Sequence, residues 1–240
     1  MKTSPIFITV LLTTFFIVFF SACKKNESDQ GGNGSVTYDT YDVDANGIPK
    51  FVRTNYIELV NIYRISKFRS GEGHDYSDDF ESCRSMKHYF NPKDSVNWAA
   101  IKIYSPVNGT ISKIEQEWAG TQIQIKSELY PAFFFNIFHI NLSKPLNLGE
   151  SVNAGQQLGT HIGSQTMSDM AVGVYTPKGR KLISYFDVMT DSLFQGYQLR
   201  GISSRIDAII SKEARDADAL TCNGETFTNT GNLENWIILN

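Results

Sequence analysis

The chain has little of what marks several common classes of protein. Its net charge is −3 at pH 7, so it has no basic field that would attract nucleic acid. No G-x-S-x-G turn and no reactive cysteine context is present, which leaves no basis for a nucleophilic triad. No repeat of solenoid length is visible. Histidine is scarce: there are four in 240 residues and none from 164 to 240.

A long hydrophobic run occurs only near the start, and it is too short to span a bilayer. Ile6 to Phe20 is nearly all apolar, about 15 residues where roughly 20 are needed. The run ends in Phe20-Ser21-Ala22-Cys23, which resembles the bacterial lipobox except that Phe20 replaces the usual leucine. This resemblance implies a lipoprotein signal peptide over residues 1–22 and a diacylglycerol anchor on Cys23. The alternative is an ordinary signal peptide followed by an incidental cysteine.

Residues 23–37 are polar and rich in glycine and serine. Such a segment cannot bury enough apolar surface to offset its ordering entropy, so we expect a flexible tether between membrane and domain. Lys24 stands where an aspartate commonly marks retention at the inner membrane. The expected location is therefore the cell envelope, at the outer membrane.

Only three cysteines are present, and a lipid on Cys23 would leave two. Because the envelope is an oxidising compartment, we expect Cys83 and Cys222 to form a disulfide. The alternative is two separate free thiols.

Aromatic residues and alternating apolar patterns predict a mainly β protein. Aromatics make up 12% of the chain, and runs such as residues 101–104, 122–126, 132–140, 171–175 and 181–188 have the pattern of strands. Residues 57–67 fit a helix and a strand equally well. Residues 203–220 place apolar side chains on one helical face, which predicts one C-terminal helix capped by Ser203 or Ser204.

The segment Y38DTYDVDANG47 opens like a calcium-binding loop. Arg53 stands where such a loop supplies its final glutamate, so we favour an Asx-rich turn over a calcium site.

Two glycine-containing segments, S105PVNGTISKI114 and G149ESVNAGQQLG159, resemble the duplicated hybrid barrel. This architecture is shared by biotinyl carriers and lysostaphin-like (LytM-type) zinc endopeptidases. A carrier needs a modifiable lysine on a hairpin between the two halves, and the Met-Lys pair after the leader, Met86-Lys87, precedes the barrel. The resemblance is therefore to the peptidases, which implies a barrel-sandwich hybrid, that is, a two-sheet antiparallel β domain.

The peptidase resemblance also implies a site. His74 and Asp78 in HDYSD match the family's H-x-x-x-D zinc ligands, and His139 in IFHI matches its catalytic histidine. The following H-x-H pair is missing. In the best register Asp169 stands at its catalytic histidine and Ala171 at its third zinc ligand. Asp169 is then the best substitute ligand, ahead of Cys83, His88 and His161.

Hydrolytic zinc needs three protein ligands and an open position, so zinc is possible here but not assured. We expect a non-catalytic member that binds a cell-wall glycopeptide or another peptide, or that regulates a hydrolase. The alternatives are an active zinc endopeptidase with an unusual third ligand and a purely structural lipoprotein. The expected organisation is an N-terminal extension over 38–70, the peptidase-type β domain over 71–190 and a helical extension over 191–240.

Overall fold

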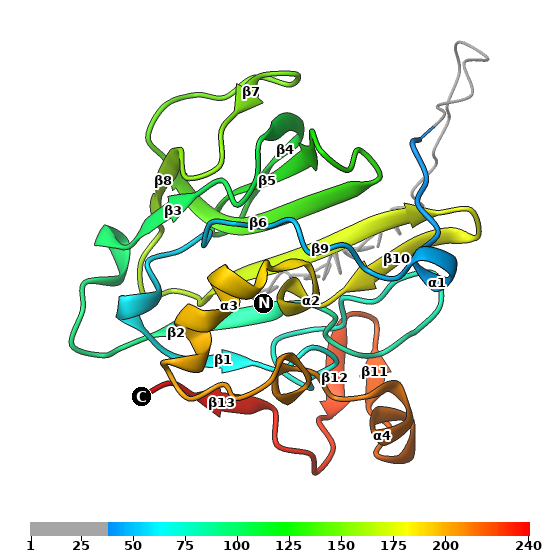
Figure 1. Ribbon diagram of the computed structural model, residues 1–240. Coiled ribbons are helices and arrows are strands. Elements are labelled where there is room, and N and C mark those ends of the chain that lie inside the picture. The colour runs from blue at the N-terminus through cyan, green and yellow to red at the C-terminus, as the bar shows by residue number, and fades with distance from the viewer. Residues whose placement is uncertain (1–37) are drawn as a thin grey trace, which may run out of the picture. The chain divides into compact units, whose positions relative to one another are not determined.

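The computed structural model describes residues 38–240, which form one unit (Figure 1). The predicted signal peptide, Cys23 and the tether lie outside the described residues. Within residues 38–240 no helix is long and apolar enough to cross a membrane.

The fold is mainly β and antiparallel, as predicted, and the described strands close no barrel. An 11-stranded sheet has the main order β13-β1-β2-β9-β6-β5-β4-β7, with β10 paired to β9 and β8 joining β3 to β6. Its strands are β1 (Ile62–Ser66), β2 (His88–Pro92), β3 (Lys102–Tyr104), β4 (Gly109–Glu117), β5 (Gly120–Ser127), β6 (Phe133–Leu142), β7 (Ser151–Val152), β8 (Gln157–His161), β9 (Ser168–Thr176), β10 (Gly179–Ile183) and β13 (Trp236–Ile238). A separate hairpin pairs β11 (Thr221–Asn223) with β12 (Thr226–Asn229).

Strand β6 lies in the middle of the sheet order, and both of its faces are covered. Its first eight residues are all buried, as expected for an aromatic run without polar alternation. The rings of Phe133 and Phe135 pack against Phe51, which comes from the segment before β1. On the opposite face Phe134 packs against Tyr175 of β9, so the core forms on both sides of this strand.

Strand β6 changes partner along one edge. Its first half pairs with β9, ending at Ile137 opposite Met170, and its last residues pair with β8, starting at Ile140 opposite His161. On the other edge, Phe138 and His139 share one position of β5, which is a β-bulge, and His139 has φ +59°. The bulge places both side chains where β8 and β9 diverge. We call this place the sheet junction.

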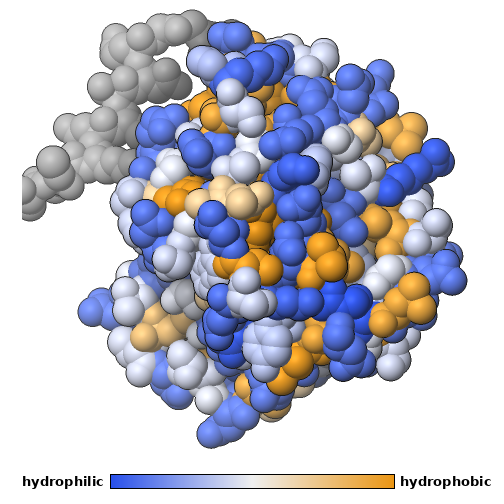
Figure 2. All heavy atoms as spheres, turned by 90° about the vertical axis from the view of Figure 1, so that its left-hand side faces the viewer, coloured by the Kyte–Doolittle hydropathy of each residue, from blue (hydrophilic) through white to orange (hydrophobic). Residues whose placement is uncertain are grey.

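The helices are short and lie outside the sheet. They are α1 (Val43–Asn46), α2 (Tyr185–Val188), α3 (Asp191–Gln198) and α4 (Lys212–Ala217), with 3₁₀ turns η1 (Leu59–Asn61), η2 (Trp98–Ala100) and η3 (Arg205–Ala208). The face in Figure 2 carries hydrophobic residues in patches between hydrophilic ones.

The prediction of one helix over residues 203–220 is wrong. The segment forms η3 and then α4, and Ile209 and Ile210 between them are extended against Phe68. Serine begins each piece: Ser204 makes a capping box for η3, and the side chain of Ser211 caps α4. The helical spacing of isoleucines was misleading because Ile206 is 74% exposed. Pairing with Phe68 outweighs local helix propensity here.

Two open questions from the sequence are settled by the fold. Residues 57–67 form η1 followed by β1, so the strand alternative holds for the second half of the segment. The Asx-rich turn is confirmed, since the side chain of Asp42 accepts hydrogen bonds from the N–H groups of Asp44 and Ala45 at the start of α1.

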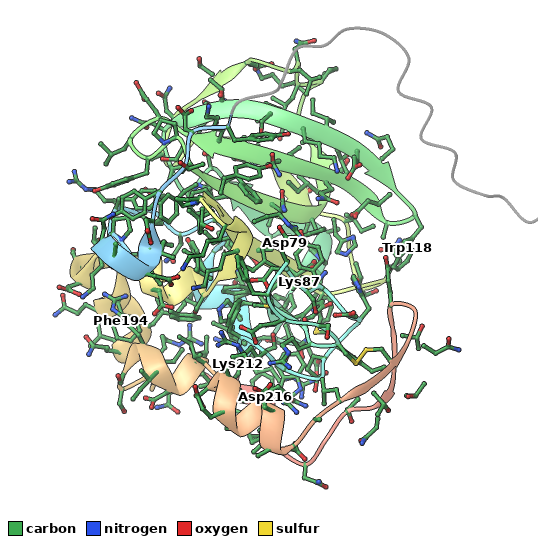
Figure 3. The ribbon with its side chains drawn as sticks, turned by 90° about the vertical axis from the view of Figure 1, so that its right-hand side faces the viewer. Asp79, Lys87, Trp118, Phe194, Lys212 and Asp216 are labelled. Atoms are coloured by element: carbon green, nitrogen blue, oxygen red, sulfur yellow. A yellow bond between two sulfur atoms is a disulfide. The ribbon has the colours of Figure 1, made fainter. Side chains whose placement is uncertain are left out.

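The predicted disulfide is confirmed. Cys83 and Cys222 are bonded, with their Cα atoms 5.7 Å apart and 139 residues apart in sequence (Figure 3). The bond ties the loop after Asp78 to the β11–β12 hairpin.

Candidate functional site

Asp78, a predicted zinc ligand, is used by the backbone. Its Oδ1 accepts hydrogen bonds from the N–H groups of Phe80 and Glu81, each at 2.9 Å, and its Oδ2 accepts one from Leu182 at 2.8 Å. Oδ1 therefore closes the turn of its own loop, and Oδ2 fastens that loop to β10. A carboxylate with these partners is a structural cap, as an Asx turn requires.

His74, the other predicted ligand of that motif, faces a lysine. Its Nδ1 lies 3.0 Å from the carbonyl of Asp75, and its Nε2 lies 3.2 Å from Nζ of Lys87. Nδ1–H then donates to the carbonyl while Nε2 accepts from the ammonium. Gly73 has φ +71°, and a Cβ there would lie 1.9 Å from the Tyr89 hydroxyl, so glycine is required for this approach.

Lys87 is the centre of the cluster and lies inside the domain (Figure 3). Its side chain is 1% exposed, and its Nζ is 2.5 Å from Oδ2 of Asp169, whose side chain is fully buried. The ammonium also lies 4.3 to 5.0 Å from the centres of three aromatic rings, those of Tyr76, Tyr89 and Phe138. Ring faces of this kind stabilise a cation, the more so away from water.

The second oxygen of Asp169 faces the predicted catalytic histidine. Oδ1 is 3.4 Å from Nε2 of His139, whose Nδ1 lies 2.9 Å from the carbonyl of Ala119 and 3.3 Å from Oε2 of Glu117. A side-chain row His74, Lys87, Asp169, His139 and Glu117 therefore runs through the sheet junction. The structure thus brings together three of the four predicted site residues and separates Asp78 from them.

The charges in this row shift each other's pKa values. Burial alone would lower the pKa of Lys87, but the adjacent Asp169 carboxylate outweighs it and the pKa of Lys87 is raised. Burial, followed by the Lys87 ammonium, lowers the pKa of His74. Burial also raises the pKa of Glu117, and His139 opposes that change. At neutral pH Lys87 is a cation and His74 is neutral.

The donor set does not fit a hydrolytic zinc ion. Asp78 is committed to three N–H groups, and Ala171, buried beside Phe138 and Leu182, has no donor atom. The Lys87 ammonium contacts His74 and Asp169, where a second cation would be repelled. Among residues 38–240 no group of three or more His, Cys, Asp or Glu side chains is arranged to hold a metal.

The other substitute ligands are also committed elsewhere. Cys83 is in the disulfide. His88 is buried, with Nδ1 2.8 Å from the carbonyl of Ser66 and Nε2 2.9 Å from the hydroxyl of Ser184. His161 accepts a hydrogen bond from the N–H of Gly163 at 3.2 Å.

Lys87 belongs to the site although the sequence does not predict it there. Its local sequence invites only comparison with a carrier lysine, because nothing in it marks the side chain for burial. Lys87 does stand directly before an aromatic run, H88YFN91, that has the composition of a buried strand. This position is a weak sign that the lysine is half-buried. Only the pairing of Tyr89 with Asp169 brings the carboxylate to it.

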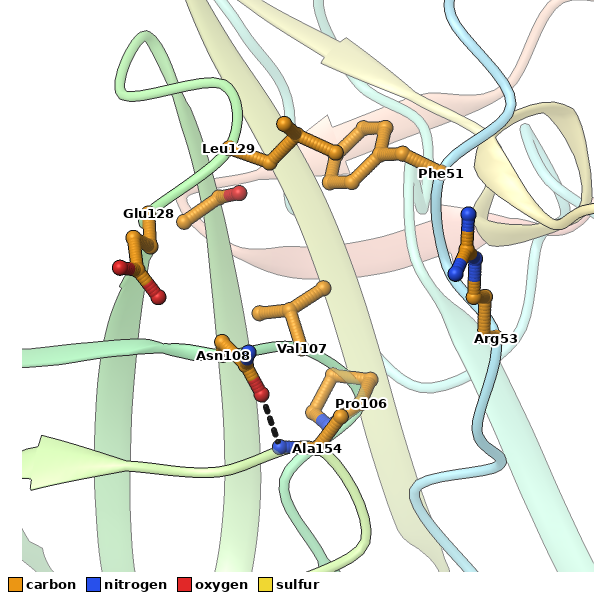
Figure 4. Close-up of a pocket in the computed structure, with 9 residues that line it drawn as sticks. Phe51, Arg53, Pro106, Val107, Asn108, Glu128, Leu129 and Ala154 are labelled. Carbon is orange, nitrogen blue, oxygen red and sulfur yellow. Dashed lines mark hydrogen bonds between the residues drawn. The ribbon is translucent and has the colours of Figure 1, made fainter.

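A separate pocket lies at the other end of the β4–β5 hairpin (Figure 4). It has a volume of about 410 Å³, near the lower end of the range for small-molecule sites. Its apolar wall is formed by Phe51, Pro106, Val107, Leu129 and Ala154.

Arg53 and Glu128 stand on opposite sides of this pocket. Neither side chain makes an ion pair or hydrogen bond to any residue in the described part of the chain. Asn108 fixes the wall between them, since its Oδ1 accepts from the N–H of Ala154 and its carbonyl from the N–H of Glu128. The pocket thus offers one free cation and one free anion across an apolar surface.

Comparisons with known proteins find structural neighbours among LytM/M23 peptidase-family proteins. A protein described as the glycyl-glycine endopeptidase LytM from Ruminococcus gnavus has 13% identity and a TM-score of 0.34, over 42% of this chain and 43% of its own. The deep-sea M23 metalloprotease pseudoalterin has 17% identity and a TM-score of 0.34, over 57% and 73%.

The SpoIIQ–SpoIIIAH pore-forming complex gives 12% identity and a TM-score of 0.40, over 62% of this chain and 96% of the matched one. The alignment spans less than half of the R. gnavus protein. No family model matches the chain, and no sequence relative is found among curated proteins. With TM-scores below 0.5, these neighbours carry no argument about activity.

Proposed function

We propose that the chain is an envelope lipoprotein whose lysostaphin-like domain is non-catalytic and binds short peptides with charged ends. The observation that supports this proposal is the Lys87 ammonium, which contacts two of the residues predicted to hold zinc. The lipid on Cys23 would hold the domain at the outer membrane.

The loss of hydrolysis follows from charge. A zinc peptidase stabilises the oxyanion of its tetrahedral intermediate with a metal and with donors aimed at it. Here a carboxylate, Asp169, stands where the family has a catalytic histidine, and it repels a developing negative charge. His139 is the residue that matches a catalytic histidine of the family, and its Nε2 faces Asp169.

The pocket between Arg53 and Glu128 is the part of the surface that fits a peptide. The guanidinium can take a carboxylate in a two-point contact, and the Glu128 carboxylate can take an ammonium. An apolar side chain would fill the space against Phe51 and Val107. Cell-wall stem peptides carry groups of both charges, which makes them the expected ligands.

Metal content and turnover test the non-catalytic part. Mature protein and the His74→Ala variant would be assayed for bound zinc by mass spectrometry and for cleavage of peptidoglycan. We expect no stoichiometric zinc and no cleavage in either. Zinc that disappears in the variant, together with cleavage by the wild type, would show an active endopeptidase.

Peptide binding tests the other part. The probe is the tripeptide Ala-Leu-Ala, compared with forms blocked at the amino or the carboxyl end, by calorimetry. We expect Arg53→Gln or Glu128→Gln to weaken binding about tenfold, the size of one charged hydrogen bond. The matched controls are Lys113→Gln and Glu115→Gln, an exposed ion pair on β4 outside the pocket. Equal binding of free and blocked peptides would contradict the assignment.

The anchor is tested separately. Cys23→Ser should release the protein from the membrane fraction, and retention of that variant would rule out lipidation at Cys23 as the anchor.

A further inference from the structure

We propose that Lys87 and Asp169 are joined by an amide bond between their side chains, formed by the folded domain itself. The structure places the primary amine of Lys87, directly before β2, in contact with the carboxyl group of Asp169 on the neighbouring strand β9, and both side chains are at most 1% exposed. This inference does not rest on the proposed function, because Lys87 occupies Asp169 and keeps a metal from it either as an ion pair or as an amide.

The two groups are held together by the register of the sheet. Tyr89 of β2 lies opposite Asp169 of β9, and Lys87 comes two residues earlier on the same face of the chain. Nζ and Oδ2 are 2.5 Å apart, which is shorter than the usual separation of an ammonium and a carboxylate oxygen. Reacting groups fixed at this separation have effective concentrations many orders of magnitude above those in solution.

As an ordinary ion pair, the contact leaves the hydrogen-bonding capacity of the Asp169 carboxylate largely unused. Within residues 38–240, neither oxygen of Asp169 accepts a hydrogen bond of good geometry, although both are buried. A buried ion pair is favourable only when its remaining lone pairs are satisfied. An amide removes both charges from the interior and leaves one carbonyl oxygen and one N–H, so condensation relieves the cost of desolvation.

The reaction is balanced and needs no other reactant. Proton transfer within the pair gives the amine and the carboxylic acid, and the amine lone pair attacks Cγ of Asp169. A C–N bond forms, a C–O bond breaks, and the oxygen leaves as water with two of the three ammonium protons. No atom is oxidised or reduced, and the product and the starting pair are both neutral overall.

The surroundings favour the condensation. The rings of Tyr76, Tyr89 and Phe138 surround Nζ and exclude the bulk water that would hydrolyse the product. The oxygen that leaves is Oδ1 or Oδ2, and His139 Nε2 faces Oδ1 at 3.4 Å. His139 can deliver a proton there, and Glu117 and the Ala119 carbonyl can stabilise its ring through Nδ1.

Intact-mass measurement of the purified, folded protein decides the matter. The expected mass is that of the mature, disulfide-bonded chain less one water. Trypsin does not cut after an acylated lysine, so the digest should contain residues 85–93 attached to a fragment that includes Asp169. Full mass in folded protein would overturn the proposal, and so would a lost water that maps to other residues.

Variants sharpen the test. Asp169→Asn should lose ammonia in place of water when it condenses, and Lys87→Arg should keep its full mass. In His139→Gln, formation of the bond after refolding should slow by tenfold or more, provided circular dichroism shows native structure. Formation at the wild-type rate would remove His139 from the reaction.

An internal control is available in every digest. Lys126 and Asp39 form an ion pair at 2.7 Å on the surface. We expect no bond there, because water reaches both groups. A cross-link at that pair equal to the one at Lys87 would mean that the linkage is a chemical artefact and would overturn the proposal. The result leaves the zinc and peptide experiments independently interpretable.

Discussion

Two aspartates that the sequence assigns to one site, Asp78 and Asp169, lie in different surroundings. Asp78 is in a loop near the surface, where three backbone N–H groups satisfy its two oxygens. Asp169 is on a central strand with no exposed surface, and its one close partner of opposite charge is Lys87. The first holds a loop in place, and the second holds a charge in the core.

The difference shows that the role of a carboxylate depends on which groups donate hydrogen bonds or positive charge to it. Backbone N–H groups engage both oxygens of Asp78. The ammonium leaves Asp169 with a partner that excludes a metal by charge. A site of four predicted residues therefore becomes a structural turn and a buried ionic row.

Removal of Lys87 tests the junction most severely. Lys87→Met should lower the free energy of unfolding by about 3 to 5 kcal/mol, because Asp169 is then a buried charge without its partner. Urea denaturation measures the change. Lys87→Met combined with Asp169→Leu should recover most of the loss, and an additive double variant would contradict this account.

The disulfide tests the region of Asp78. Cys83→Ser with Cys222→Ser should cost about 2 to 4 kcal/mol, because the bond closes a long loop in the unfolded chain. The midpoint of urea unfolding would report it, with dithiothreitol on the wild type as a second route. We expect the environment of Lys87 to stay the same in this variant. A change in the NMR shift of the Lys87 side chain would show that the two regions are coupled, contrary to expectation.

Acid should weaken the strand next to Lys87. Burial lowers the pKa of His88 from 6.5 to about 4, and the Ser66 carbonyl opposes the shift. The unfolded chain then binds a proton before the folded one does, so stability falls as pH drops from about 6.5 to about 4, by up to about 3 kcal/mol. The difference between wild type and His88→Gln across this range isolates the effect, and parallel curves would be incompatible with a neutral buried His88.

The smallest effect is expected at the turn. Asp78→Ala leaves three N–H groups without their acceptor and should cost about 1 to 3 kcal/mol. Asp78→Asn keeps one carbonyl oxygen and should cost less. Thermal unfolding measures both, with Asp94→Ala as an exposed control, and an unchanged zinc content would agree with a structural role for Asp78.

Much of the fold could be predicted locally. Alternation gave the strand near 122–126, and the unbroken aromatic run gave a strand with two buried faces. The strand predicted over 181–188 is wrong beyond Ile183, because Ser184 caps a helix there and residues 185–188 form α2. The disulfide followed from counting cysteines in an oxidising compartment. These features depend on side-chain pattern and chemistry alone.

The broken C-terminal helix and the site could not be predicted in this way. Ile209 and Ile210 have helical spacing, yet pairing with Phe68 from a distant segment extends them. His74, Lys87, His139 and Asp169 were each visible in the sequence. Their order in space depends on which strands are neighbours.

The sequence by itself determined that His74, His139 and Asp169 are present and that two cysteines can pair. It also determined that the histidine expected as the third zinc ligand is absent. The tertiary structure decided that Lys87 meets Asp169, because the pairing of β2 with β9 joins residues about 80 positions apart in a buried junction. Residue types are local information, whereas a contact between buried charges depends on strand register.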